Sequence, residues 1–415
     1  MSFGRSISGG GYGLEAKQLA RRGQPQTSGP GRALGQLARA PPPAAASSPT
    51  AAMDADVERE YGGRFLAEYN KKRLLGKGAC GAVWLASSSR HGGAVALKQV
   101  AKGSSAKSRA DERSANTEIA VGNLLFGPGG TPKVSPNAYP GIRYITRLLD
   151  AMETKKDLWM VMEYGGDVLS KALFEVKGEF ASRGTAQPRE RVYRVHHLPF
   201  YEAMKQDPRV FKRLVRQVLE AIRLLADHGI VHSDLKPENL LLKGSETEPL
   251  GLREVRLCDF GSSFMCDQPG QLVLATPEYM PPEALEACIG NANGSRRERA
   301  KPWSFDVWSL GAIMLELCYG VPHWLSYKCR VRGLDGAKDH SLVGLFAVPA
   351  RSHERILQRQ EEITAEGGLR RALNNALGVP LDADGFDLLE GMLQWDPEYR
   401  ISPAEALDHP YLRED

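Results

Sequence analysis

The chain of 415 residues is long enough for two lobes, and its formal net charge of +4 at pH 7 is small for this length. Lysine and arginine are spread along the sequence, so we expect no nucleic-acid partner. No apolar run reaches the roughly 20 residues that span a bilayer, so we expect no membrane partner either. The six cysteines include no C-x-x-C pair, which is typical of reduced thiols in an intracellular protein, cytoplasmic or nuclear.

Residues 1–60 are rich in Gly, Ala, Pro and Ser, and we expect a disordered tail because such a composition buries little apolar surface. The bias of residues 1–52 toward basic side chains is also found in organelle transit peptides, but a solvated tail is the preferred interpretation. Met53 is a second candidate for the start of translation. The basic residues before Met53 are Arg5, Lys17, Arg21, Arg22, Arg32 and Arg39, and the single acid there is Glu15.

The first structured segment, 74–85, has two apolar arms around a glycine-rich turn. A hairpin tip of this kind can lie close to a phosphate chain because glycine lacks Cβ. A dinucleotide-binding turn would be followed by a helix, whereas 83–86 continues as β-prone sequence. The residues expected to contact nucleotide here are Leu75, Gly76, Gly78, Gly81 and Val83.

The next strand-like run, 94–100, alternates around Lys98, which would point inward among apolar neighbours. A buried lysine needs an anionic partner, and nucleotide phosphates would serve. The run resembles the Val-Ala-x-Lys strand of protein kinases.

A helix is expected over 116–125, where Glu118 lies beside an apolar face. Glu118 is the preferred ion-pair partner of Lys98, and the family uses the making or breaking of this pair as a switch. Glu112 competes if the helix starts earlier, but the Ser-, Lys- and Arg-rich stretch 103–114 favours a loop.

The apolar run 158–164 predicts a buried strand that leads out of the first lobe. By resemblance, Met162 stands at the gatekeeper position, and Glu163 and Tyr164 offer backbone groups to an adenine edge. Two glycines follow at once, which makes the hinge shorter than is usual in the family. Asp167 is therefore either a ribose partner or a residue of a surface turn.

The run 230–242 places Asp234 and Asn239 five residues apart on a loop between apolar segments, and Asp259 follows from the next strand pair. These groups can converge to hold a divalent metal and a hydroxyl together, since Mg²⁺ prefers carboxylate and amide oxygens. The loop and Asp-Phe-Gly at 259–261 resemble the catalytic loop and metal-binding motif of eukaryotic protein kinases, with Ser233 where most members carry Arg. A helix with an apolar stripe, about 210–228, is expected to support the loop.

Phosphoryl transfer asks a protein mainly to position reactants and neutralise charge. Asp234 is assigned the role of accepting or orienting the acceptor hydroxyl, the alternative being a turn residue that caps its own loop. Lys236 can stabilise the transferring phosphoryl group and, by resemblance, indicates Ser/Thr acceptors. Asn239 and Asp259 are the expected Mg²⁺ ligands. The residues expected to enclose the adenine ring are Ala96 and Leu241.

The segment 259–283 contains no basic residue, and its only hydroxyls before Thr276 are Ser262 and Ser263. Kinases that are switched by loop phosphorylation bind the new phosphate with the Arg that Ser233 replaces here. We therefore hypothesise that activity does not require phosphorylation of this segment. Both serines and the small residue at 233 also resemble the dual-specificity tyrosine-regulated kinases, but their loop tyrosine is absent and no subfamily is assigned.

The run 276–283 resembles the peptide-positioning element of the family, with Thr276 beside the catalytic aspartate and lysine. By the same resemblance, Glu283 should pair with Arg400, and Asp306 should cap the backbone of the catalytic loop. We expect both to be structural.

The resemblance covers residues 69–412 and implies an α+β, bilobal protein-kinase fold: a small antiparallel β-sheet N-lobe with one main helix (about 61–162) and a larger, mainly α C-lobe (about 163–415). Stretches 127–141, 177–197 and 288–302 are expected to be insertions, the second a mobile solvated loop. The expected activity is ATP- and Mg²⁺-dependent phosphorylation of Ser/Thr in protein substrates. The sequence leaves the oligomeric state open, and a monomer is the default. A non-catalytic pseudokinase scaffold is the alternative, and a small-molecule kinase is a lesser one.

Overall fold

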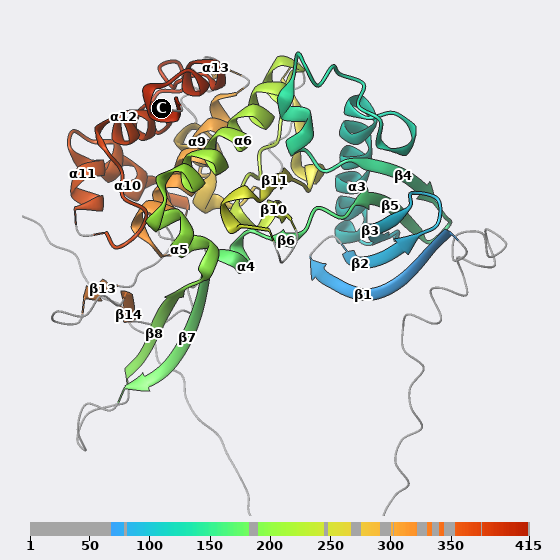
Figure 1. Ribbon diagram of the computed structural model, residues 1–415, viewed down its shortest axis with the longest axis horizontal. Coiled ribbons are helices and arrows are strands. Elements are labelled where there is room, and N and C mark those ends of the chain that lie inside the picture. Colours follow the sequence, from blue (N-terminus) through green and yellow to red (C-terminus); the bar gives the residue numbers. More distant parts are fainter. Residues whose placement is uncertain are drawn as a thin grey trace, which may run out of the picture. The chain divides into compact units, whose positions relative to one another are not determined.

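The computed structural model describes residues 68–78, 81–181, 190–244, 248–266, 275–290, 300–301, 303–321, 330–333, 340–343, 353–374 and 376–413 (Figure 1). The predicted disordered tail, residues 1–60, lies outside the described residues. The fold class predicted from the sequence is confirmed, with a five-stranded antiparallel sheet in the N-terminal lobe and a larger, mainly helical C-terminal lobe.

The sheet of the N-terminal lobe has the strand order β1-β2-β3-β5-β4. Successive side chains along a strand point to opposite faces of the sheet, and here apolar residues occupy both faces. One face packs Leu97, Trp159 and Val161 into a core, and the other packs Val100 and Met160 against helix α3. The elements are β1 (Tyr69–Gly78), β2 (Gly81–Ser88), β3 (Gly93–Ala101), α3 (Ala106–Leu125), β4 (Leu148–Glu153) and β5 (Asp157–Glu163).

Helix α3 begins earlier than predicted, so the expectation of a loop over 103–114 is wrong. Ser105 caps the helix, its hydroxyl accepting from the backbone N–H of Ser108, and such a cap stabilises a helix start by about 1 kcal/mol. Lys107 and Asp111 add an ion pair at i,i+4 spacing. These polar interactions form the first turns without an apolar stripe, which is why periodicity did not reveal them.

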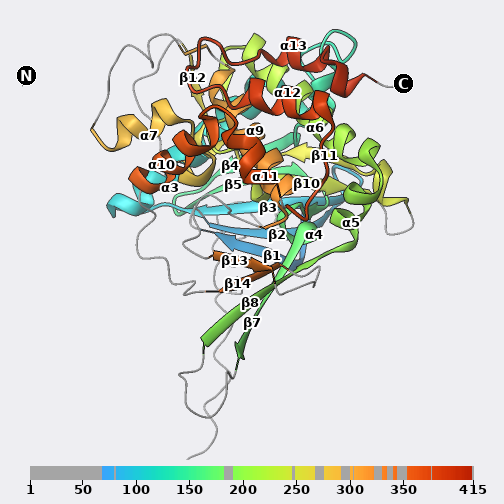
Figure 2. The same cartoon turned by 90° about the vertical axis from the view of Figure 1, so that its left-hand side faces the viewer.

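Helices α6 and α9 form the centre of the C-terminal lobe (Figure 2). The apolar stripe of α6 is buried as predicted, and α9 is buried on all sides. No helix in the described ranges is long and apolar enough to cross a membrane. The helices of this lobe are α4 (Ser170–Leu173), α5 (Pro199–Gln206), α6 (Pro208–Asp227), α7 (Pro282–Cys288), α9 (Ser304–Tyr319), α10 (His353–Thr364), α11 (Gly368–Leu373), α12 (Ala383–Met392) and α13 (Pro403–Leu407).

Two small sheets lie where the lobes meet. Strand β10 pairs with β11 and with β6, which directly follows the segment that leaves the N-terminal lobe. Strand β9, just before the predicted catalytic loop, pairs with β12, just after the Asp-Phe-Gly motif. The strands are β6 (Asp167–Val168), β9 (Ile230–Val231), β10 (Leu240–Lys243), β11 (Glu254–Leu257) and β12 (Phe264–Met265).

The stretch 177–197 is not the predicted solvated loop, because most of it belongs to a four-stranded antiparallel sheet. Strands β7 (Phe174–Ala181) and β8 (Glu190–His197) form a long hairpin, and β14 (His340–Val343) pairs with β8, joining β13 (Arg330–Gly333) to it (Figure 1). Residues 182–189 lie outside the described part of the chain.

The stretch 127–141 is largely exposed through residue 138, as predicted, but its end is packed. A Cβ on Gly141 would lie 1.9 Å from the carbonyl oxygen of Glu220 on α6, so only glycine fits there. Of the stretch 288–302, residues 291–299 and residue 302 are outside the described chain.

Candidate active site

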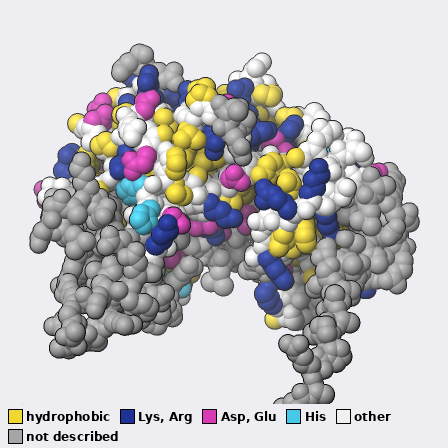
Figure 3. Space-filling view, turned by 60° about the horizontal axis from the view of Figure 1, so that its bottom comes forward, with side chains coloured by type: hydrophobic (Ala, Val, Ile, Leu, Met, Phe, Trp, Pro, Cys, Tyr) yellow, Lys and Arg dark blue, Asp and Glu magenta, His cyan; other side chains and the backbone are white. Residues whose placement is uncertain are grey.

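A cleft of about 540 Å³ lies between the sheet of the N-terminal lobe and the loops of the C-terminal lobe, a size typical of ligand sites. Among the predicted site residues whose side chains the structure describes, Thr276 does not line it, and the surroundings of Gly78 are not described. Charged side chains of both signs are interspersed with apolar ones on the face shown in Figure 3. The predicted residues that line the cleft are Leu75, Gly76, Gly81, Val83, Ala96, Lys98, Glu118, Met162, Glu163, Tyr164, Asp167, Asp234, Lys236, Asn239, Leu241 and Asp259.

Lys98 lies on β3 with 8% of its surface exposed. Its Nζ is 2.6 Å from Glu118 Oε2, the predicted ion pair, and 2.9 Å from Asp259 Oδ1. Burial lowers the pKa of Lys98, but the carboxylates of Glu118 and Asp259 outweigh burial and raise it above the usual value. Lys98 therefore remains an ammonium ion, available to a phosphate group. The competing Glu112 lies earlier on the same helix.

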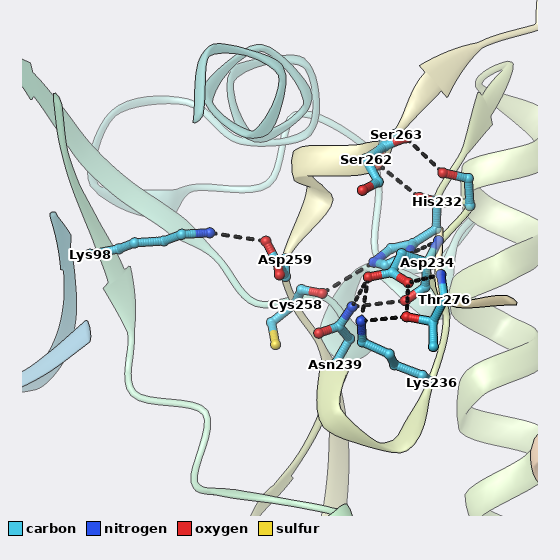
Figure 4. A network of polar contacts seen from close by, with 11 residues as sticks. Lys98, His232, Asp234, Lys236, Asn239, Cys258, Asp259, Ser262, Ser263 and Thr276 are labelled. Atoms are coloured by element: carbon cyan, nitrogen blue, oxygen red, sulfur yellow. Dashed lines mark hydrogen bonds and ion pairs between the residues drawn. The ribbon is translucent and has the colours of Figure 1, made fainter. Parts of the chain in front are cut away.

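Asp259 stands at a backbone φ of 65°, in the left-handed region, and 44% of its side chain is exposed, to the cleft. Although burial raises the pKa of Asp259, the Lys98 ammonium holds it below the usual value, so the carboxylate is ionised. The Nδ2 of Asn239 donates to the carbonyl oxygen of Asp234 at 2.8 Å and to its Oδ2 at 3.2 Å. Because Nδ2 is used in this way, the amide oxygen remains available to a ligand (Figure 4).

The donor set fits Mg²⁺, which prefers hard oxygen ligands and commonly takes one or two protein ligands with the rest from phosphates and water. Among the residues described, no group of three or more His, Cys, Asp or Glu side chains could hold a metal alone. Asn239 and Asp259 would therefore share the ion with a bound nucleotide.

The Asp234 carboxylate is held from several sides (Figure 4). Lys236 Nζ lies 2.6 Å from Oδ2. Thr276 donates to Oδ1 from both its backbone N–H at 3.0 Å and its hydroxyl at 2.7 Å. The same hydroxyl accepts from Lys236 Nζ at 2.8 Å. Thr276, although it does not line the cleft, therefore fixes the orientation of Asp234.

Asp306 holds the backbone of the catalytic loop just before Asp234. With 1% of its surface exposed, it accepts from the backbone N–H groups of His232 at 2.8 Å and Ser233 at 2.9 Å. Ser233 has a φ of 64°, and its hydroxyl donates to the carbonyl oxygen of Ser262 at 2.6 Å. The catalytic loop and the start of the segment after Asp-Phe-Gly are thus joined by uncharged contacts.

The predicted pair of Glu283 and Arg400 is also formed. Arg400 Nη1 lies 2.9 Å from Oε1 and Nη2 lies 3.2 Å from Oε2, and neither side chain is more than 5% exposed. The guanidinium lies 5.0 Å from the centre of the Trp308 ring. This bidentate pair attaches the 276–283 element to the body of the lobe.

Ala96, Leu241 and Met162 line the cleft together, at the end that the resemblance assigns to the base and that we call the base end. Asp167 is exposed on β6, which pairs with β10. Several lining residues, among them Ser114 and Cys258, are not predicted from the sequence. The Oγ of Ser114 lies 2.1 Å from where a Cβ on Gly261 would be, a close approach that only a fold can reveal.

A model of the protein kinase domain family matches residues 69–412, and the chain belongs to this family. It is 28% identical over 245 residues to the putative mitogen-activated protein kinase 14C of Drosophila melanogaster, covering 54% of this chain and 59% of that protein. It is 27% identical over 373 residues to cyclin-dependent kinase G-1 of Oryza sativa subsp. indica, covering 85% of this chain and 43% of that protein. It is also 27% identical over 211 residues to the DYRK-family kinase pom1 of Schizosaccharomyces pombe, covering 49% of this chain and 18% of that protein. The chain thus spans less than two thirds of the length of each of these relatives.

Proposed function

We propose that the protein is an ATP-dependent serine/threonine protein kinase that transfers the γ-phosphoryl group of ATP to hydroxyls of protein substrates. The observation that carries the proposal is the arrangement around the cleft. Lys98, paired with Glu118 and Asp259, lies on one side, and Asp234, held by Lys236 and Thr276, lies on the other. Family membership supports the same function.

In this proposal Lys98 binds nucleotide phosphates, and Asn239 and Asp259 hold Mg²⁺, which neutralises charge on the phosphates when it is bound. Asp234 orients the acceptor hydroxyl and takes its proton. A bond forms between the acceptor oxygen and the γ-phosphorus, the bond from that phosphorus to the bridging oxygen breaks, and ADP leaves. Lys236, 2.6 Å from Asp234, is close enough to stabilise negative charge on the transferring group.

The proposal includes activity without phosphorylation of the segment 259–283. Ser233 Oγ to Ser262 O and the pairing of β9 with β12 hold the start of this segment, and neither contact involves a phosphate. We expect a Ser262→Ala, Ser263→Ala variant to keep its activity. Loss of activity in this variant, which keeps the accepting carbonyl of residue 262, would contradict independence from phosphorylation.

Incorporation of labelled phosphate from ATP into a generic protein substrate tests the activity, with Asp234→Asn as the comparison. A general base is worth roughly 10²- to 10⁴-fold in rate, so the variant should be nearly inactive while it still binds Mg·ADP. If both proteins are equally active, Asp234 does not have the proposed role. If the wild-type protein binds nucleotide and transfers no phosphate to any protein, the scaffold alternative is favoured.

A further inference from the structure

The carboxylate of Glu163, at the end of β5, is buried among three cationic side chains that do not line the cleft. Its Oε2 lies 3.0 Å from Lys243 Nζ and 3.2 Å from Arg147 Nη2. Its Oε1 lies 3.6 Å from Arg256 Nε and accepts from the backbone N–H of Arg147 at 3.2 Å. Only 6% of Glu163 is exposed. We call these four residues the Glu163 cluster.

The cluster joins the two lobes at the point where the chain crosses between them. Glu163 and Arg147 belong to the end of the N-terminal sheet, since the backbone N–H of Glu163 donates to the carbonyl oxygen of Arg147 at 3.0 Å. Lys243 ends β10 and Arg256 lies on β11, two paired strands of the C-terminal lobe. One carboxylate therefore links strand ends that are distant in sequence.

The segment that follows Glu163 has little freedom of its own. A Cβ on Gly165 would lie 2.6 Å from Leu241 Cδ1, and a Cβ on Gly166, at a φ of 96°, would lie 1.9 Å from the carbonyl oxygen of Leu242. The backbone therefore lies directly on β10, and Leu241 of this strand also lines the base end of the cleft. Because the cluster holds Glu163 in place, it also fixes the orientation of the joining segment, 164–166, relative to the cleft.

The cluster is not arranged for stability alone. Arg256 Nε is buried and makes no hydrogen bond to any described residue. Buried ion pairs often add little to stability because desolvation offsets their attraction, and in some proteins they instead select one arrangement of the chain. The arrangement selected here is the path of the segment beside the nucleotide base.

We propose that Glu163 is a positioning residue for nucleotide binding, its carboxylate fixing the joining segment so that Tyr164 and Leu241 hold the base. This inference rests on the proposed function in taking a nucleotide as the ligand. It assigns the effect of Glu163 to the base end of the cleft, away from Lys98 and Asp259, which serve the phosphates.

Calorimetric titration with adenosine and with Mg·ADP tests the proposal on the full chain. Glu163→Gln keeps the shape of the side chain and removes its charge, and it should weaken both ligands by the same factor, roughly three- to tenfold. Lys98→Met should weaken ADP and leave adenosine unchanged. Glu153→Gln is the matched control, because this glutamate is 65% exposed, pairs with Lys102 and does not line the cleft; both affinities should equal those of wild type.

In phosphate-transfer assays Glu163→Gln should raise the KM for ATP by the same factor with little change in kcat, the result expected when uniform binding is lost. Lys243→Gln, at a side chain 40% exposed, should act in the same direction without leaving a carboxylate unpaired. If both variants bind adenosine as tightly as wild type, with only the melting temperature lowered, the cluster is merely structural and the proposal is wrong. If wild type binds neither ligand, the proposed function fails before any variant is compared.

Discussion

For the buried ion pair of Glu283 and Arg400, we can predict how much unfolding free energy is lost when one partner is removed. The Arg400 side chain is fully buried and the Glu283 side chain is 5% exposed. Removing one partner of such a pair leaves a buried charge and costs about 3–5 kcal/mol. Arg400 keeps the carbonyl oxygens of Ser304 and Gln394 as acceptors, so the lower end, about 3 kcal/mol, applies to Glu283→Gln.

The unfolding entropy is about 2.1 cal/mol/K per residue, so in a domain that spans residues 69–412 each kcal/mol changes the melting temperature by roughly 1–2 °C, and Glu283→Gln should melt about 3–6 °C below wild type. Differential scanning calorimetry of the full chain measures this shift. Asp111→Asn is the control: its pair with Lys107, whose side chain is 68% exposed, is worth only about 0.3–0.5 kcal/mol.

The salt dependence of the melting temperature distinguishes the buried ion pair from the exposed one. Adding 0.5 M NaCl should remove the small effect of Asp111→Asn, because exposed charges are screened, and should leave the effect of Glu283→Gln. The reasoning is refuted if Glu283→Gln lowers the melting temperature by no more than the control does.

Three further predictions use other contacts. Gly122→Ala, whose Cβ would lie 2.6 Å from Leu148 Cδ2, should not gain the roughly 1 kcal/mol expected from helix propensity, since overpacking costs about 1–3 kcal/mol. Chemical denaturation measures the free energy of unfolding. Gly391→Ala, on helix α12 with no contact closer than 3.5 Å, is the control that should gain stability, and a full gain in Gly122→Ala would contradict the prediction. Thr276→Ala should lose roughly ten- to hundredfold in kcat, because Asp234 loses the hydroxyl that donates to its Oδ1 and Lys236 loses the acceptor of its second hydrogen bond, while Thr276→Ser should stay near wild type. Equal losses in both variants would show that the hydroxyl is not what matters. Burial raises the pKa of the Cys258 thiol, so iodoacetamide at pH 8 should leave this thiol unmodified in the native protein. Mass spectrometry measures the modification, and alkylation as fast as in urea would contradict the prediction.

The part of the site that sequence could predict is the part built from short motifs. Asp234 and Asn239 are five residues apart on one loop, and the structure joins them by a hydrogen bond. The contact of Lys98 with Glu118 followed from one buried lysine and one glutamate on an apolar helix face. In each case the chemistry of the residue type restricted its possible partners, so a local pattern carried three-dimensional information.

The four-stranded sheet that contains β7 and β8 could not be predicted in the same way. Its strands are rich in charged residues, and the pairing of Arg194 with Ser341 joins positions far apart in the sequence. Side-chain packing against cross-strand neighbours, more than intrinsic preference, makes a polar stretch a strand. Here the neighbouring strand is β14, which local periodicity does not identify.

The two non-glycine residues with positive φ in the described chain are Ser233 and Asp259. No local sequence signal indicates that the backbone is left-handed at either position. Such conformations cost about 1–3 kcal/mol each and persist only where the surroundings impose them. Asp306 imposes the first through the backbone N–H of Ser233, and Lys98 holds the Asp259 carboxylate at the second. The strain thus lies next to the catalytic loop aspartate and at the expected metal ligand. Asp306, far from the catalytic loop in sequence, therefore sets the backbone geometry that this loop requires.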